Sequence, residues 1–124
     1  MKLKVIKTAD VVIVGFTPGE GWRKEYFGAL AIGAYNNGKL VFMGKVGTGF
    51  DEALIKSISA LLRVRTTDLK PVEEEPPYEV RWVKPDLVCE VKFMEFTPDL
   101  KLRAPVFRRL RHDKPPEECE TPAS

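Results

Sequence analysis

The chain has 124 residues, of which 31% are charged, and its formal net charge is +2. This length predicts one domain with one modest core, and no stretch approaches the ~20 consecutive apolar residues of a membrane-spanning helix. The N-terminal residues mix Lys7, Thr8 and Asp10 among apolar positions, so they lack the continuous apolar segment of a secretory signal. We therefore expect a cytoplasmic protein with no membrane partner.

The first part of the chain predicts three strands. Residues 9–16 are rich in β-branched side chains and end in a Pro-Gly-Glu-Gly loop, which favours a strand. A second strand is predicted over residues 27–35 and a third over residues 39–45. Asn37 and Gly38 lie between them and tolerate the positive φ of a tight turn, so these two strands should form a hairpin.

An amphipathic helix of about three turns is predicted after the third strand. Apolar residues recur on one helical face at Leu54, Ile58, Leu61 and Leu62. Asp51 is suited to cap the N-terminus of this helix, and we expect Phe50 to pack on Ile55 there.

The rest of the chain predicts a connection and two further strands. Residues 66–85 contain four prolines and a run of three glutamates, which predicts an extended connection across the surface. Residues 87–96 alternate apolar and polar side chains as a strand does, and residues 97–99 form the turn that ends it. The last strand is predicted over residues 106–111.

The predicted order β-β-β-α-β-β is that of an OB-fold. This all-β fold is a five-stranded Greek-key barrel, here with one α-helix between strands three and four. Small SH3-like barrels lack the helix and are the second choice. We assign residues 1–114 to the OB-fold domain and expect residues 115–124, which are acidic and proline-rich, to form a mobile tail.

The cysteines and the single histidine do not predict a disulfide framework or a metal site. Cys89 lies in an apolar strand and Cys119 in the polar tail, so we expect one buried and one exposed thiol. His112 has no second histidine with which to form a metal site. No metal ligand is therefore predicted.

Three segments occur in the same order in one enzyme family. Residues 103–118 end a strand-like segment in Arg-His-Asp-Lys beside a Pro-Glu tail, and residues 45–51 form a glycine-rich turn. Residues 82–91 open an apolar strand with Trp-Val-Lys-Pro. These segments resemble motif VI, the glycine-rich turn and the strand-opening segment of the C-terminal OB-fold domain of ATP-dependent DNA ligases. The likeness is closest to the bacterial and archaeal end-joining type.

The resemblance to motif VI implies that Arg111, Asp113 and Lys114 assist catalysis. The two cations would orient the ATP pyrophosphate while a lysine of another domain attacks, and Asp113 would position them. A guanidinium suits phosphate because it stays charged and offers a planar fork of donors. Strand alternation predicts that Val106 and Leu110 anchor the barrel, which leaves Arg111 free to leave the core.

The first residues resemble the end of motif V, a Trp-x-Lys-x-Lys pattern whose lysines contact the nucleotide α-phosphate. Lys2 and Lys4 match its two lysines, while the tryptophan is missing because the chain begins within the motif. The resemblance implies that Lys2 and Lys4 bind the nucleotide. It also leads us to expect a domain cut from a longer ligase.

Two glycine-rich loops and the basic last strand predict DNA contacts. Glycines at residues 15–23 and 47–49 let the backbone approach a sugar-phosphate chain, and the second loop precedes a helix N-terminus, which favours anions. Purely structural turns are the alternative for both loops. The predicted DNA-binding residues are Arg23, Gly47, Thr48, Gly49 and Arg109.

Ligation in this family needs a nucleophilic lysine in a Lys-x-Asp-Gly sequence, and no such sequence occurs here. The chain alone is therefore not expected to ligate. The complete enzyme would use ATP and Mg²⁺, neither bound by this domain alone, and its partners would be nicked duplex DNA and the nucleotidyltransferase domain of the same ligase. Two alternatives stay open: a freestanding OB module that binds single-stranded nucleic acid, and the OB domain of a capping-type nucleotidyltransferase.

Overall fold

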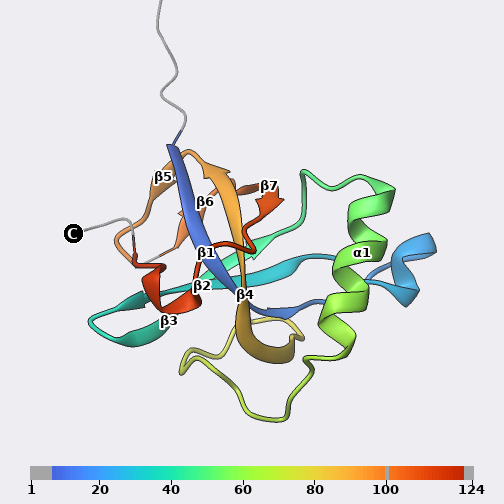
Figure 1. Ribbon diagram of the computed structural model, residues 1–124, viewed down its shortest axis with the longest axis horizontal. Helices are drawn as coiled ribbons and strands as arrows, with labels where there is room; N and C mark the ends of the chain where they lie inside the picture. The colour runs from blue at the N-terminus through green and yellow to red at the C-terminus, as the bar shows by residue number, and fades with distance from the viewer. Residues whose placement is uncertain (1–6, 100, 122–124) are drawn as a thin grey trace, which may run out of the picture.

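The computed structural model describes residues 7–99 and 101–121, and most of its regular structure is antiparallel β-sheet (Figure 1). In chain order the elements are β1 (Lys7–Phe16), the 3-10 helix η1 (Gly21–Glu25), β2 (Leu30–Asn36), β3 (Lys39–Val46), α1 (Glu52–Arg63), β4 (Arg81–Phe93), β5 (Glu95–Phe96), β6 (Leu102–Arg103), β7 (Val106–Leu110) and the 3-10 helix η2 (Pro116–Glu118).

Five strands form one sheet in the order β3-β2-β1-β4-β7. The central strand β1 pairs antiparallel with β2 and, over a longer ladder, with β4 from Lys7↔Phe93 to Phe16↔Arg81. The hairpin predicted at Asn37 and Gly38 is confirmed, since both residues have positive φ between β2 and β3. This order of strands, with one helix after the third, is consistent with an OB-fold.

The predicted helix is also confirmed. The Asp51 side chain caps α1 by accepting a hydrogen bond of 2.7 Å from the backbone N–H of Leu54. The face of α1 that carries Ile55, Ile58 and Leu62 is buried against the sheet. No helix in the described part of the chain is long and apolar enough to cross a membrane.

Both faces of the central strand are covered. Val11 and Ile13 belong to the cluster that packs on α1, whereas Val12 and Val14 belong to a second cluster on the other face. Part of the second cluster is Val72, which comes from the connection before β4 and is buried. This connection, expected to cross the surface, therefore supplies an apolar anchor, and the continuous aliphatic run in β1 follows from burial on two sides.

The fourth strand begins earlier than predicted. β4 starts at Arg81 and includes Pro85, which a regular central strand excludes because proline has no N–H to donate. The β1 ladder is interrupted here: Ile13 pairs with Leu87, and Gly15 pairs with Trp82. Pro85 thus lies where β4 has no partner on β1, so the missing N–H costs the ladder nothing.

The predicted alternation in the last strand is wrong at one end. Val91 pairs with Phe107 and Glu90 pairs with Arg109, so Arg108 is an extra residue that forms a β-bulge. The bulge resets the alternation and turns Phe107 into the core, where it is 3% exposed. Phe107, and not Val106, is therefore the core anchor of β7.

The segment that follows motif VI packs on the sheet where a mobile tail was expected. The Tyr35 N–H donates to the Cys119 carbonyl at 2.7 Å, and the Thr121 N–H donates to the Tyr35 carbonyl at 3.0 Å. Cys119, expected to be exposed, is buried, and this burial raises the pKa of its thiol to about 11. The backbone of β2 beyond its ladder with β1 offers the N–H and carbonyl that dock the segment. Residues 122–124 lie outside the described residues.

Candidate active site

Three neighbouring strands bring two carboxylates and a pair of arginines together. Across the sheet, Asp10 of β1 pairs with Glu90 of β4, and Glu90 pairs with Arg109 of β7. Glu90 forms ion pairs of 3.6 Å with Arg108 and 3.3 Å with Arg109. The bulge at Arg108 places these two successive arginines within reach of one carboxylate.

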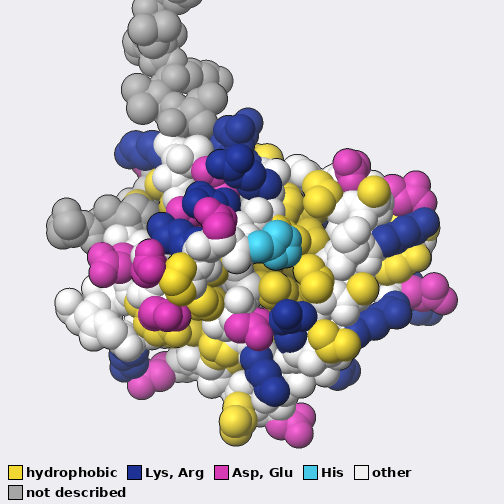
Figure 2. Space-filling model, in the orientation of Figure 1, with side chains coloured by type: hydrophobic (Ala, Val, Ile, Leu, Met, Phe, Trp, Pro, Cys, Tyr) yellow, Lys and Arg dark blue, Asp and Glu magenta, His cyan; other side chains and the backbone are white. Residues whose placement is uncertain are grey.

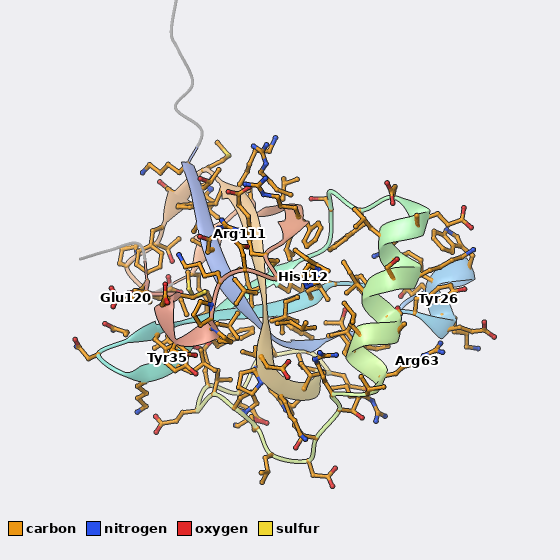
Figure 3. All side chains as sticks on the ribbon, viewed as in Figure 1. Tyr26, Tyr35, Arg63, Arg111, His112 and Glu120 are labelled. Carbon is orange, nitrogen blue, oxygen red and sulfur yellow. The ribbon has the colours of Figure 1, made fainter. Side chains whose placement is uncertain are left out.

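Arg111 directly follows β7 and is held there by its backbone, whose N–H donates to the Val88 carbonyl at 2.7 Å. Its guanidinium donates to both carboxylate oxygens of Asp113, at 3.0 and 3.1 Å, and to Oδ1 of Asp10 at 3.2 Å. Arg111, which Figure 3 labels, thus connects the turn after β7 to the central strand β1.

Lys114 reaches the same aspartate from the other side. Its Nζ donates to Oδ2 of Asp10 at 3.0 Å, so one carboxylate binds Arg111 and Lys114 with separate oxygens. The Asp10 side chain is 18% exposed, which shields this contact from solvent more than a surface ion pair. We call Asp10, Arg111, Asp113 and Lys114 the motif VI cluster.

Within the motif VI cluster, each charged group stabilises the charged form of its neighbours. The hydrogen bonds with Asp113 and then the charge of Asp10 raise the pKa of Arg111, and the hydrogen bond with Asp10 raises the pKa of Lys114. The hydrogen bond from Arg111 lowers the pKa of Asp113. All three groups are therefore charged at neutral pH.

Both cations keep hydrogen-bond donors for a further anion. The guanidinium of Arg111 has more N–H groups than its bonds to Asp10 and Asp113 use, and Lys114 donates one of its ammonium protons to Asp10. Figure 2 shows Lys, Arg, Asp and Glu side chains interleaved over the strand ends at the top of this face, next to His112. Preordered cations of this kind suit a phosphate group.

The predicted DNA-binding residues fall in two places. Arg23 and Gly47 line one surface groove of ≈ 450 Å³, together with Lys45. The Arg23 guanidinium donates to the backbone carbonyls of Phe27 at 3.1 Å and Gly28 at 2.8 Å, so part of its role is to hold the loop before β2. Thr48, Gly49 and Arg109 lie instead at β7.

The glycine-rich turn makes close backbone contact with β7. The Phe107 N–H donates to the Thr48 carbonyl at 2.9 Å. Gly49 has a φ of 95°, and a Cβ at this position would overlap the Phe107 carbonyl oxygen. At Gly49, the contact with β7 therefore supports the alternative that this glycine is needed for the fold. At Gly47 a Cβ would make only ordinary van der Waals contacts, so the fold does not require a glycine there.

The sequence pattern did not indicate Asp10 or Glu90 as functional residues. Their only signal is a carboxylate within a run of apolar strand residues, and register with β7 cannot be read from the sequence. Lys2 and Lys4 lie outside the described residues. His112 is exposed, and the described residues contain no group of three or more side chains arranged to hold a metal ion.

The chain matches one protein family and several longer proteins. Residues 23–114 match the family described as the ATP dependent DNA ligase C terminal region. The multifunctional non-homologous end joining protein LigD of Mycolicibacterium smegmatis is 40% identical over 122 residues, which is 95% of this chain and 16% of LigD. A DNA ligase of Methanopyrus kandleri is 35% identical over 130 residues, which is 98% of this chain and 22% of the relative. The chain thus spans under a quarter of the length of these relatives.

Solved structures agree with the sequence relatives. The ligase domain of Mycobacterium tuberculosis LigD superposes with a TM-score of 0.85 at 37% identity, covering 92% of this chain and 38% of that domain. A mycobacterial DNA ligase D complexed with ATP and MES superposes with a TM-score of 0.80 at 35% identity, covering 93% of this chain and 38% of that chain. Because the family match covers most of the chain, this chain belongs to the ATP-dependent DNA ligase family, as a C-terminal region.

Proposed function

We propose that this chain acts as the C-terminal domain of an ATP-dependent DNA ligase and assists adenylylation of the enzyme. The observation that carries the proposal is the sharing of Asp10 between Arg111 and Lys114, at 3.2 and 3.0 Å. A binding module without catalysis has no need for two cations that one shielded carboxylate holds side by side. Nucleotidyl transfer from ATP needs such a pair of cations, because its leaving group is a pyrophosphate.

In the proposed reaction, a lysine of the nucleotidyltransferase domain attacks the α-phosphorus of ATP, and the bond to pyrophosphate breaks. Arg111 and Lys114 use their spare donors to bind pyrophosphate oxygens, which gain negative charge as this bond breaks. Asp10 holds the two cations together, and Asp113 fixes the plane of the Arg111 guanidinium through paired hydrogen bonds. Asp10 and Asp113 are therefore positioning residues, not acids or bases.

The metal required by the complete enzyme does not fit this cluster. Asp10 and Asp113 already bind cationic side chains, and the part of the chain that the structure describes has no metal-ligand group. When bound, Mg²⁺ neutralises phosphate charge, and we assign its ligands to the nucleotidyltransferase domain. No step on the present chain depends on it.

Changing Asp10 to Asn tests the sharing of one carboxylate. Asn keeps the shape of the side chain but loses the charge, and its NH₂ group faces one of the two cations. We expect adenylylation of a complete ligase that carries this chain to slow by about tenfold, measured as single-turnover transfer of labelled AMP to the enzyme.

The matched control is Asp99→Asn, because the Asp99 carboxylate accepts from Thr97 in the β5–β6 turn and has no contact with the motif VI cluster. Sealing of a pre-adenylylated nick should change less than adenylylation in the Asp10 variant. If both steps slow equally, Asp10 only stabilises the fold and the proposed role is wrong.

We also propose that the domain contacts nicked duplex DNA through Arg109 and the groove that Arg23 and Gly47 line. Arg109 is 65% exposed, and among the described residues it forms one ion pair, at 3.3 Å to Glu90, so most of its guanidinium N–H groups are available to a phosphate. Gly47 has no Cβ to keep a phosphate from the backbone N–H groups of the turn.

The Arg109→Ala variant tests this contact. We expect the chain to bind duplex DNA more weakly, with a slope of log affinity against log salt reduced by about 1, because one phosphate contact is lost. Fluorescence anisotropy at several salt concentrations measures the slope. Lys39→Ala is the control, since Lys39 pairs with Glu73 at the far end of β3. An unchanged slope in the Arg109 variant would show that Arg109 does not contact a DNA phosphate.

The finer fold assignment belongs to the same proposal. The five strands are linked as an open sheet, and we propose that it curls into a partly open Greek-key barrel. The hydrogen bond from the Phe107 N–H to the Thr48 carbonyl supports this closure, because it joins β7 to the residues that follow β3.

A further inference from the structure

A cavity of ≈ 290 Å³ lies between α1, η1 and the paired ends of β1 and β4. Figure 3 shows Arg63 and Tyr26, which line it, well apart from Arg111. None of the residues of the motif VI cluster lines this cavity. Its contents therefore have no part in the adenylylation proposed above.

The cavity contains a buried hydroxyl with no partner. Ser59 lines it from α1 and is 4% exposed, and its Oγ makes no hydrogen bond within the described part of the chain. No other buried side-chain nitrogen or oxygen in that part lacks a partner. Because native proteins rarely leave such a group unpaired, this hydroxyl has a hydrogen bond to offer to a molecule bound in the cavity.

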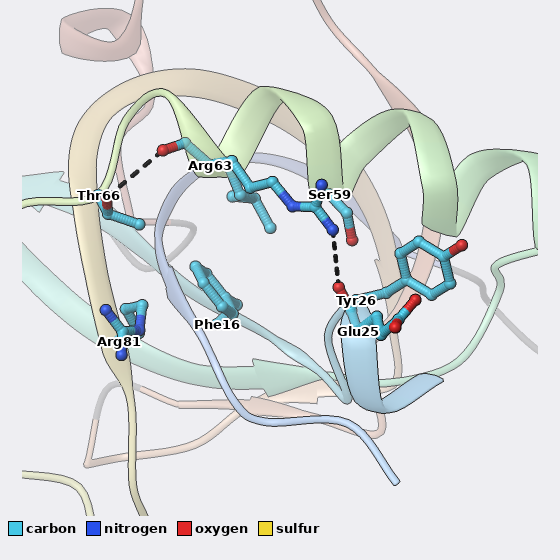
Figure 4. Close-up of a pocket in the computed structure, with 8 residues that line it drawn as sticks. Phe16, Glu25, Tyr26, Ser59, Arg63, Thr66 and Arg81 are labelled. Atoms are coloured by element: carbon cyan, nitrogen blue, oxygen red, sulfur yellow. Dashed lines mark hydrogen bonds between the residues drawn. The ribbon is translucent and has the colours of Figure 1, made fainter. Parts of the chain in front are cut away.

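Two arginines from different elements face the same space. Arg63 comes from the last turn of α1, and Arg81 is the first residue of β4, where the β-ladder places it opposite Phe16 (Figure 4). Neither forms an ion pair with a carboxylate among the described residues, in contrast to Arg111. The Arg63 guanidinium donates to the Glu25 carbonyl at 3.0 Å, which orients it across the cavity without neutralising it.

The remaining walls define the kind of anion. Thr66 also lines the cavity, where its hydroxyl donates to the backbone carbonyl of Arg63 at 3.4 Å (Figure 4). The apolar surface comes from Phe16, Tyr26 and Leu62. Two guanidiniums and the Ser59 hydroxyl match the acceptor oxygens of a phosphate better than the two oxygens of a carboxylate. The aromatic and aliphatic walls suit an organic group next to the phosphate, and ≈ 290 Å³ is near the lower end of ligand-pocket volumes, which fits a ligand the size of one nucleotide.

We propose that this cavity binds the phosphate ester of a nucleotide. Arg63 and Arg81 bind the phosphate, the Ser59 hydroxyl donates a further hydrogen bond to it, and the sugar and base lie on Phe16 and Tyr26. The exposed carboxylate of Glu25 at the rim opposes the bound charge and limits the affinity.

The test is a titration of the ¹⁵N-labelled chain with AMP, followed by backbone amide shifts. We expect saturable shifts at residues 59, 66 and 81, weaker effects with inorganic phosphate, and none at these residues with adenosine. A 5′-phosphorylated oligonucleotide gives larger shifts if the natural ligand is a strand end, and equal or smaller shifts if it is a free nucleotide. Absence of saturable shifts with both nucleotide probes, or shifts confined to Arg111 and Lys114, would overturn the proposal.

Substitutions at single residues show whether each residue strengthens or weakens AMP binding. Arg81→Ala should weaken AMP binding by about tenfold, and Glu25→Gln should strengthen it severalfold because the opposing charge is removed. Ser59→Ala should weaken binding and raise the melting temperature of the free chain, since the unpaired hydroxyl is gone. Arg103→Ala on the β5–β6 hairpin is the charge-matched control. Unchanged affinity in both the Arg81 and Ser59 variants would show that the cavity is only a packing defect.

Discussion

A complete ligase that carries this chain with Arg111 or Lys114 replaced by Ala is expected to adenylylate itself ~30- to ~1000-fold more slowly. The reason is the charge that pyrophosphate gains as it leaves, which each cation would stabilise in a shielded setting. Sealing of a pre-adenylylated nick releases AMP and no pyrophosphate, so it should slow much less. Rapid-quench measurement of enzyme-AMP formation, compared with sealing of the pre-adenylylated substrate, separates the two steps.

Arg111 also links the turn after β7 to Asp10 in β1, so its loss leaves a partly buried carboxylate with Lys114 alone. We therefore expect a modest drop in melting temperature for Arg111→Ala, and Arg111→Lys serves as a second variant that keeps the charge. Arg111→Lys should fold normally and still adenylylate slowly, because an ammonium cannot bind Asp113 in a paired manner and pyrophosphate together. Normal adenylylation in an Arg111 and Lys114 double variant would return both residues to a purely structural role.

The parts of this fold that local patterns control could be predicted from the sequence. The helix at 52–63 follows from its apolar spacing and from Asp51, and the hairpin at Asn37 and Gly38 follows from residues that accept positive φ. Neither depends on distant partners. Arg111, Asp113 and Lys114 could be picked out together because they are adjacent in the sequence, and their catalytic role stays a prediction.

The features that the sequence did not predict all depend on pairing between distant segments. The bulge at Arg108 is defined only by the pairing of β7 with β4, where Glu90 pairs with Arg109 and Val91 with Phe107. Alternation alone therefore assigned the core position to Val106 in place of Phe107. Cys119 is buried because the backbone N–H and carbonyl of Tyr35 in β2 bind the segment around it. The acidic, proline-rich composition of that segment predicted a mobile tail instead. Asp10 was overlooked for the same reason, since its two cations lie about 100 residues away in the sequence.

Gly49 and Gly47 provide the second large effect, as a matched pair within one turn. Gly49→Ala is expected to lower the free energy of unfolding by about 2 to 5 kcal/mol, because an alanine would be strained at a φ of 95° and its Cβ would press on the backbone of β7. That Cβ would lie 2.8 Å from the Phe107 nitrogen and overlap its carbonyl oxygen, and these are backbone atoms of a paired strand, which cannot give way as the end of a flexible side chain can. The hydrogen bond between Phe107 and Thr48 should weaken as well.

Gly47→Ala should change the free energy of unfolding by less than about 1 kcal/mol, since its Cβ would meet only the Ala29 Cβ at 3.5 Å and the Gly28 carbonyl oxygen at 3.7 Å. Urea denaturation of the two variants measures the difference, and DNA binding of the folded Gly47 variant shows whether the turn also serves DNA. A loss of duplex affinity in Gly47→Ala at unchanged stability would support close approach of a phosphate to this backbone. A Gly49→Ala chain as stable as the parent would contradict the tight contact between this turn and β7.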